Sequence, residues 1–181
     1  MELFWEKGYQ STSVADILER AGVNTGSVYH FFPGKQDVLL AVLTAYRDGI
    51  DAMLLTPAWG TIDDPIERVF ALLARYRVLI VQNHCTYGCP IGSLALELHE
   101  PDPAVRELLA ENFQAWTGAV EKNVRAAKLT LPKGVTPKMV AGFALTTMEG
   151  GVMLSRTHRH VRYFDEAVPQ LRCYFDLLKQ Q

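Results

Sequence analysis

Residues 22–35 read Gly-Val-Asn-Thr-Gly-Ser-Val-Tyr-His-Phe-Phe-Pro-Gly-Lys, and this stretch decides how the N-terminal part of the chain folds. The pair Asn24 and Thr25 suits the start of a helix, because a short polar side chain can accept hydrogen bonds from the free N–H groups of the first turn. Pro33 and Gly34 end that helix only about two turns later. A helix this short, with three aromatic residues and a histidine, needs a neighbouring element to hold it.

The preceding residues predict that neighbour, a first helix joined to the second by a tight turn. Ser13 is suited to cap it, and Gly22 to take the left-handed conformation just beyond its end. Its buried stripe is formed by Val14, Ile17, Leu18 and Ala21. On the second helix, the packed face holds Val28, Phe31 and Phe32, and the opposite, exposed face holds Gly26, Tyr29 and His30.

This layout is that of a helix-turn-helix, whose second helix enters the major groove of DNA. Small residues let the helix backbone approach the groove, and hydroxyl and imidazole groups can bond phosphates or base edges. An ordinary helical hairpin with a polar exposed face fits the same pattern. The charge of residues 1–47 argues against DNA binding, since four basic and five acidic side chains leave a net charge of −1.

The composition indicates a folded protein. Of 181 residues, 49% are hydrophobic and 21% charged, which excludes a disordered chain, and the net charge of −2 gives no general sign of nucleic-acid or membrane binding. No apolar run approaches the roughly 18 residues needed to span a bilayer, and the first residues do not form a secretory signal. Three cysteines do not make a disulfide framework. We therefore expect a cytoplasmic protein.

The rest of the chain reads as long helices. Apolar residues recur at three- and four-residue spacing, and prolines after Asp64, Asp102 and Thr136 mark helix starts. The predicted helices cover residues 35–55, 65 to at least 80, 91–99, 103–129, 137–153 and 166–179. No strand pattern or repeat is found. The sequence thus predicts an all-α fold, with a head over residues 1–47, whose first helix is short, and a larger helical body over residues 48–181.

Residues 4–43 also resemble a known family. The matching motif reads Phe4-x-x-Lys7-Gly8-Tyr9-x-x-Thr12-Ser13-Val14-x-Asp16-Ile17, then Ala21-Gly22-Val23-x-x-Gly26-Ser27-Val28-Tyr29-His30-Phe31-Phe32-x-x-Lys35-x-x-Leu39. It resembles the DNA-binding domain of TetR-type (TetR/AcrR) transcriptional regulators. The resemblance implies an all-helical homodimer with a three-helix helix-turn-helix head and a ligand-binding body, in which an effector changes the spacing of the two heads.

The same resemblance assigns the DNA contacts by position. It implies that the recognition helix carries Thr25, Gly26, Ser27, Tyr29 and His30. It implies flanking phosphate contacts from Thr12, Ser13 and Lys35. Farther along, the segment 88–98 resembles one found in a branch of these regulators, where it leads into the short helix that links body to head.

Candidates for a small-molecule site are the aromatic and isolated polar residues on the inner faces of the body helices. They are Phe70, Tyr76, Arg77, Cys89, Phe113, Trp116, Phe143, Met148 and Glu149. Binding pockets are mostly apolar with a few placed polar groups, and this composition fits a pocket as well as it fits a packed core. Arg77 and Glu149 stand out, because a charge on an apolar face needs a partner: each other, solvent or an effector.

Cys85 and Cys89 allow three interpretations. Four residues apart, they are only a fragment of a metal site, so we predict no metal and no cofactor. A redox pair would need accessible thiols of low pKa. Free cysteine is most often a small buried apolar residue, and a thiol sensor is the better of the two functional options.

Helix 137–155 is rich in small and apolar residues, and the last helix adds Leu171, Tyr174, Phe175 and Leu178. By resemblance the two helices form a twofold dimer interface, as a palindromic operator requires. The sequence therefore predicts a ligand-responsive regulator, with double-stranded DNA, a small-molecule effector and a second copy as partners. A repressor at the bacterial nucleoid is favoured by the resemblance. The alternative is a helical small-molecule or thiol-redox sensor whose shortened head has lost useful DNA affinity. No enzyme motif is found.

Overall fold

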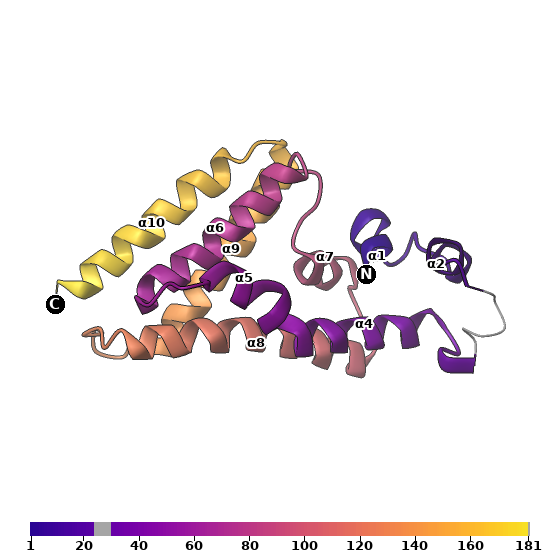
Figure 1. The fold of residues 1–181 in the computed structure, drawn as a ribbon, viewed down its shortest axis with the longest axis horizontal. Helices are drawn as coiled ribbons and strands as arrows, with labels where there is room; N and C mark the ends of the chain where they lie inside the picture. Colours follow the sequence, from indigo (N-terminus) through magenta and orange to yellow (C-terminus); the bar gives the residue numbers. More distant parts are fainter. Residues whose placement is uncertain (24–29, 181) are drawn as a thin grey trace. The chain divides into compact units, whose positions relative to one another are not determined.

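The computed structural model describes residues 1–23 and 30–180. Over these residues the chain consists of helices and connecting segments without a β-strand, which confirms the predicted all-α fold (Figure 1). The helices are α1 (Glu2–Lys7), α2 (Val14–Ala21), α4 (Lys35–Ile50), α5 (Thr56–Trp59), α6 (Pro65–Gln82), α7 (Pro90–Glu97), α8 (Pro103–Ala126), α9 (Pro137–His158) and α10 (Arg162–Lys179). A π-helical segment, Asp51–Leu55, joins α4 to α5.

The chain forms two compact units. The first contains Met1–Asp48 and Pro90–Phe113, and the second contains Gly49–Cys89 and Gln114–Gln181. The sequence predicts a single domain boundary, after residue 47. The first unit extends beyond that boundary, because it also contains α7 and the beginning of α8. Segments far apart in the chain therefore pack together in the first unit, which a division of the sequence into two continuous stretches does not anticipate.

The first unit is held by apolar side chains from α1, α2, α4, α7 and α8. Its buried residues include Leu3, Phe4, Leu18, Leu39, Leu43, Leu94, Val105 and Leu109. One buried polar link joins α8 to α4: the amide nitrogen of Asn112 donates to the carbonyl of Leu43 at 2.9 Å. A buried amide that finds a partner avoids the cost of an unsatisfied polar group, so this link fits the apolar surroundings.

The second unit packs α6, α9 and α10 together (Figure 1). Phe164 and Phe175 of α10 are completely buried, and the ring of Phe175 meets that of Phe70 on α6 edge to face at 5.4 Å. Arg172 of α10 lies over the Phe70 ring, with its guanidinium carbon 3.7 Å from the centre of that ring. The same guanidinium donates to both carboxylate oxygens of Glu67, at 2.6 and 2.9 Å. Aromatic burial thus joins α10 to α6.

The predicted helix starts are confirmed where capping is local. Asp64 Oδ1 accepts from the N–H groups of Ile66 and Glu67, and Thr136 caps α9 in the same way through Met139. The last helix begins at Arg162, upstream of the predicted residue 166. It starts earlier because Phe164 packs into the core, and burial of that ring stabilises the extra turn.

Candidate DNA-binding head and buried polar cluster

The first helix of the predicted helix-turn-helix is α2, and Ser13 caps it. Ser13 Oγ accepts from the N–H of Asp16 at 3.1 Å, and Asp16 Oδ2 accepts from the N–H of Ser13 at 2.7 Å. This reciprocal capping box satisfies two backbone donors that the first turn of a helix leaves free. The hydrogen bond from Ser13, and then the one from Lys7, lowers the pKa of Asp16 far below its usual range. Ser13 is exposed, as its predicted phosphate contact requires.

Most of the predicted recognition helix lies outside the described residues, namely Thr25, Gly26, Ser27 and Tyr29. His30 is described: it is helical and exposed, and its ring meets that of Phe31 edge to face at 5.2 Å. Phe31 is itself 72% exposed, so the interpretation of Phe31 as a buried anchor is wrong. Phe32 is half-buried. The exposed surface at this point is wider than the helical wheel indicates.

Thr12 does not lie on the surface. Its side chain is 1% exposed, and its hydroxyl oxygen lies 2.6 Å from the carbonyl oxygen of Gly8 and 3.3 Å from that of Leu3. This burial contradicts the predicted phosphate contact. Thr12 instead fastens the turn between α1 and α2 to the end of α1, because a buried hydroxyl needs an acceptor inside the fold.

Lys35, the third predicted phosphate contact, is engaged within the first unit. Its Nζ donates to the carbonyl of Tyr9 at 2.8 Å and lies 4.3 Å from the centre of the Tyr9 ring. A carbonyl oxygen and an aromatic face both attract an ammonium group, so these contacts hold the Lys35 side chain against Tyr9. The structure thus gives Lys35 a structural partner that the sequence pattern does not reveal.

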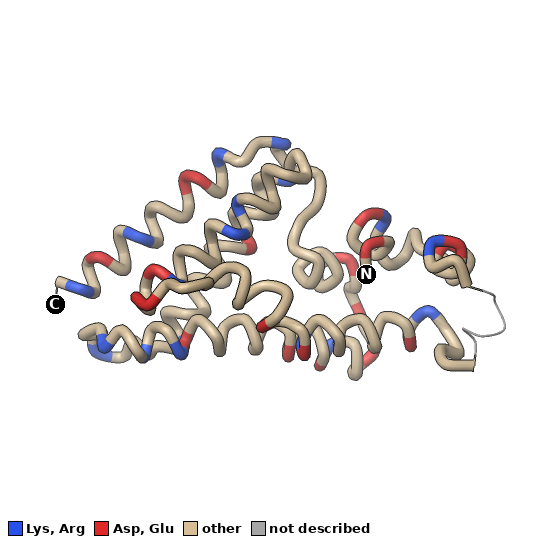
Figure 2. The backbone as a smooth tube through the Cα atoms, viewed as in Figure 1, with Lys and Arg blue, Asp and Glu red and all other residues tan. Residues whose placement is uncertain are grey.

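The other cations of residues 1–47 also have acidic partners close by. Lys7 pairs with Asp16 at 2.9 Å, Arg20 with Glu6 at 3.0 Å and Glu2 at 3.5 Å, and Arg47 with Asp48 and Glu111. Figure 2 shows acidic and basic positions together on α1 and α2. The head therefore presents no continuous basic stripe over its described residues.

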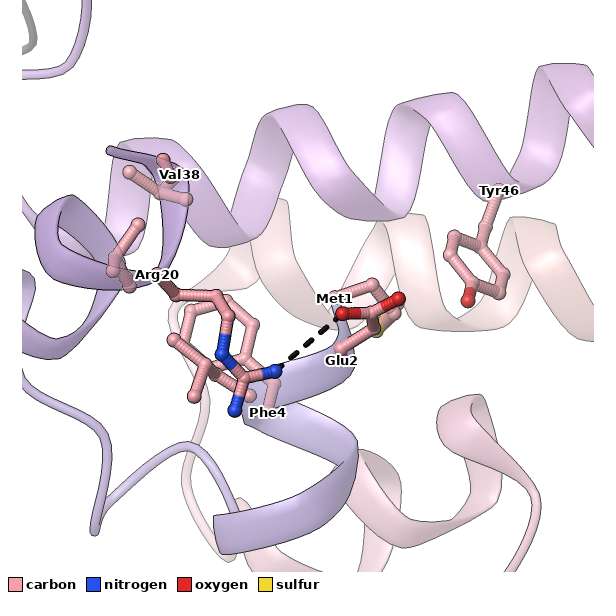
Figure 3. A pocket seen from close by; sticks show the side chains of 9 residues that line it. Met1, Glu2, Phe4, Arg20, Val38 and Tyr46 are labelled. Atoms are coloured by element: carbon pink, nitrogen blue, oxygen red, sulfur yellow. Dashed lines mark hydrogen bonds and ion pairs between the residues drawn. The ribbon is translucent and has the colours of Figure 1, made fainter. Parts of the chain in front are cut away.

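A cavity of about 440 Å³ opens between α1, α2 and α4 (Figure 3). It is lined by Met1, Glu2, Leu3, Phe4, Ile17, Arg20, Ala21, Val38 and Tyr46. The lining is mainly apolar, and its charged members, Arg20 and Glu2, form an ion pair with each other at its edge. None of the predicted ligand residues lines this cavity, because the sequence predicts a ligand pocket only in the helical body.

In the second unit, four of the predicted ligand residues come together as a buried polar cluster, defined here as Tyr76, Cys89, Trp116 and Glu149. Burial raises the pKa of Tyr76 well above its usual range, and the neighbouring Cys89 and Glu149 act in the same direction. Burial also raises the pKa of Glu149, opposed by a hydrogen bond with the Cys89 thiol. The cluster therefore favours an uncharged carboxyl and an uncharged phenol.

Two polar atoms of this cluster are buried without a hydrogen bond to any described residue: Glu149 Oε1 and Trp116 Nε1. The Trp116 indole lies beside the Tyr76 phenol and opposes the rise in the pKa of that phenol, although its N–H makes no hydrogen bond of ordinary geometry there. Trp116 is only 4% exposed, and Met148, next in the chain to Glu149, is fully buried. A donor and an acceptor are thus held inside an apolar surround, which is how small-molecule sites achieve specificity.

The remaining ligand candidates lie elsewhere. Arg77 donates to both oxygens of Asp165 on the surface, at 2.6 and 2.8 Å, so its partner is neither Glu149 nor the interior. Phe143 is 49% exposed and meets the Tyr174 ring. Phe70 belongs to the aromatic contact between α6 and α10, and Phe113 belongs to the first unit. Arg77, Phe70 and Phe143 thus have contacts with residues outside the four that define the cluster.

Sequence reasoning did not identify Asp165, because it lies 88 residues from Arg77. It also missed Arg159, whose guanidinium donates to the carbonyl of Cys85 at 2.9 Å. Both Cys85 and Cys89 are buried. Over residues 1–23 and 30–180, no three His, Cys, Asp or Glu side chains gather as a metal would require, and no helix is long and apolar enough to cross a membrane.

Comparison with known proteins agrees with this architecture. Residues 1–42 match the family described as bacterial regulatory proteins, tetR family, and residues 65–170 match the LmrA/YxaF-like C-terminal domain of transcriptional regulators. An HTH-type transcriptional regulator of Mycobacterium tuberculosis is 28% identical over 178 residues, which cover 94% of this chain and 87% of that protein. The HTH-type transcriptional repressor DhaR of Mycobacterium sp. strain GP1 is 24% identical over 167 residues, covering 91% of this chain and 82% of DhaR.

Among solved structures, the crystal structure of regulatory protein TetR from Rhodobacter sphaeroides superposes with a TM-score of 0.82 at 25% identity, covering 94% of this chain and 91% of that one. Sequence and fold thus agree over nearly the whole length. The chain belongs to the tetR family of bacterial regulatory proteins and is a helix-turn-helix transcriptional regulator with an LmrA/YxaF-like C-terminal domain.

Proposed function

We propose that this regulator is a ligand-responsive repressor: a homodimer whose two heads bind a palindromic operator until a small-molecule effector, bound in the second unit, releases them. The relative DhaR is named as a repressor, which supports repression rather than activation of transcription. Such a protein acts on chromosomal DNA, so we place it in the bacterial cytoplasm at the nucleoid, with a binding role rather than a catalytic one. The observation that carries the proposal is the buried polar cluster.

A buried polar atom without a partner costs about 1–3 kcal/mol, a cost that a bound ligand with matching groups would remove. The cluster holds two such atoms, an indole donor at Trp116 and a carboxyl acceptor at Glu149. An effector with one acceptor and one donor would satisfy both at once. The proposed effector contacts need no redox role for the Cys89 thiol, because Trp116 and Glu149 make them.

The dimer is supported by an apolar stripe on α9. Met139, Phe143 and Met153 are each about half exposed and recur with helical spacing, and Leu177 on α10 is also exposed. Along the same helix, a Cβ on Gly142 or Gly150 would meet no described atom within 4 Å. Small residues beside large exposed apolar ones suit close packing against the same stripe of a second copy.

The DNA-binding part is tested by selecting duplexes from a random library with the purified full-length protein at low salt. Enrichment of a palindrome by the wild-type protein, lost in Tyr29→Ala with unchanged far-UV circular dichroism, is expected. If the intact dimer enriches no duplex, the repressor proposal fails and the sensor with a non-binding head takes its place.

The effector part is tested by screening small molecules for release of the selected duplex. Trp116→Phe removes only the indole N–H, so an effector that uses the cluster should bind at least about tenfold more weakly. Arg77→Gln is the matched control, because its charge lies outside the cluster and it should respond like the wild type. An effector that binds both variants with wild-type affinity would place the site elsewhere.

A further inference from the structure

Glu97, the last residue of α7, holds two consecutive backbone N–H groups from the beginning of the chain. Its Oε2 accepts from the N–H of Tyr9 at 2.8 Å, and its Oε1 accepts from the N–H of Gln10 at 2.7 Å. All three residues belong to the first unit. A carboxylate that receives two N–H groups makes charge-assisted hydrogen bonds, which are shorter and stronger than bonds between neutral groups.

The turn that Glu97 holds, residues 8–10, is shaped for this contact and is called the Gly8 turn below. Gly8 has φ +85°, a backbone conformation that residues with a side chain rarely adopt. A Cβ at this position would lie 3.0 Å from both Oε1 and Oε2 of Glu97. Glycine therefore serves two purposes here: it permits the backbone conformation, and it lets the carboxylate approach the backbone closely.

The carbonyl side of the same turn is held as firmly as its N–H side. Lys35 Nζ donates to the carbonyl of Tyr9, and the hydroxyl of Thr12 lies 2.6 Å from the carbonyl oxygen of Gly8. The Glu97 carboxylate thus binds the N–H groups of the turn, and Lys35 and Thr12 bind its carbonyl oxygens. Because the turn joins α1 to the N-cap of α2, its conformation sets how the helix-turn-helix begins.

α7 meets the Gly8 turn at its C-terminal end. Cys89 of the cluster directly precedes Pro90, the first residue of α7, and Glu97 is its last. The helix rises only about 10 Å between those ends, a span too short to bend appreciably. α7 also packs against α1 along its side. A displacement of α7 as a whole would therefore reach the Gly8 turn through Glu97.

We propose that Glu97 is the positioning residue of the head: its carboxylate fixes the Gly8 turn, and through the start of the helix-turn-helix this contact sets the affinity of the head for DNA. The coupling rests on the proposed function, since it needs a head that binds DNA. Lys35 takes part as the opposing cation of the turn. Glu97 touches no DNA in this account and acts only through the turn that it holds.

Hydrogen–deuterium exchange of the full-length protein, read at single residues, tests the contact. In Glu97→Ala the amides of Tyr9 and Gln10 should exchange at least about tenfold faster, because each loses a bond to a charged acceptor. Glu97→Gln keeps one acceptor oxygen and should protect one amide better than the other. Glu107→Ala, which removes an exposed carboxylate from α8, should leave both amides as in the wild type. Unchanged exchange in Glu97→Ala overturns the proposal.

The coupling is tested with the duplex enriched from the random library. Coupling between two sites is reciprocal, so DNA bound to the wild-type head should slow exchange within residues 90–98. Glu97→Ala should abolish that DNA-dependent slowing, and Glu107→Ala should retain it. If Glu97 only stabilises the fold, Glu97→Ala would weaken DNA binding but keep the DNA-dependent slowing of exchange in α7. Either that result or the absence of such slowing in the wild type overturns the proposal. If the wild type enriches no duplex, the proposed function fails first, before any variant is compared, and the coupling fails with it.

Discussion

Gly151 lies on α9 where α10 crosses it, and an alanine there should destabilise the protein through a single contact. A Cβ at this position would lie 2.9 Å from Cδ2 of Phe164 and 3.3 Å from its Cα. The first distance is far inside ordinary carbon contact, and the second involves backbone, which cannot move without shifting α10. Phe164 is 1% exposed, so its ring has no free space into which it could turn.

Gly151→Ala changes the free energy of unfolding through two effects of opposite sign, and these must be separated. Overpacking a filled core costs about 1–3 kcal/mol, whereas replacing glycine by alanine inside a helix gains about 1 kcal/mol. Gly118→Ala on α8 provides the gain alone, because its Cβ would meet nothing within 4 Å among the described residues. The free energy of unfolding of Gly151→Ala should therefore lie about 1–3 kcal/mol below that of Gly118→Ala.

Urea unfolding followed by far-UV circular dichroism measures this difference, with all proteins at one concentration because a dimer gains stability by mass action. The unfolding free energy of the wild type should lie between those of the two variants or close to that of Gly151→Ala. Equal unfolding free energies for the two variants, within about 0.5 kcal/mol, would refute the close contact between α9 and Phe164.

Further predictions concern the cluster, the dimer, the turn and the thiols. Burial raises the pKa of Glu149 in the folded protein, so this carboxyl contributes stability in acid that is lost as the pH rises through its folded pKa; Glu149→Gln should flatten that part of a pH series of thermal melts. Phe143→Glu should turn the dimer into monomers in sedimentation velocity, since a charge would have to be buried in the interface. Thr12→Val should lower the free energy of unfolding by about 1–3 kcal/mol, as the carbonyl of Gly8 loses its partner, whereas an exposed phosphate contact would change stability little. Cys89→Ser should respond to hydrogen peroxide like the wild type in DNA binding; loss of a wild-type peroxide response in this variant would restore the thiol-sensor interpretation.

How much the sequence predicts depends on how local the cause is. Helix starts at Asp64 and Thr136 were predictable, because a cap acts on residues two or three positions away. The role of Phe31 was not, since a helical wheel orders the faces of a helix but does not say how much of each is covered. Arg77 shows the same limit: a charge on an apolar-looking face predicts that a partner exists, and only the fold brings Asp165 to it from 88 residues away.

The candidate sites divide in a similar way. Tyr76, Trp116 and Glu149 could be named from residue type and helix face, and the structure gathers them with Cys89. Thr12 and Lys35 were assigned to phosphates by position, yet their hydrogen bonds close the Gly8 turn. The decisive partner of that turn, Glu97, comes from 87 residues later in the chain, and no pattern in the first 47 residues could point to it.

The same contacts explain how an acidic head can belong to a DNA-binding protein. Lys7, Arg20 and Arg47 pair with carboxylates, and Lys35 binds the Gly8 turn, so the cations of this segment stabilise the head rather than form a basic surface. Affinity from neutralised phosphates is correspondingly small for one copy. In the proposed homodimer, recognition then relies on hydroxyl groups, backbone amides and helix termini, which both heads present and which are effective only when held in place. A head of this kind is sensitive to its own conformation, and that sensitivity is what a carboxylate at the end of α7 can exploit.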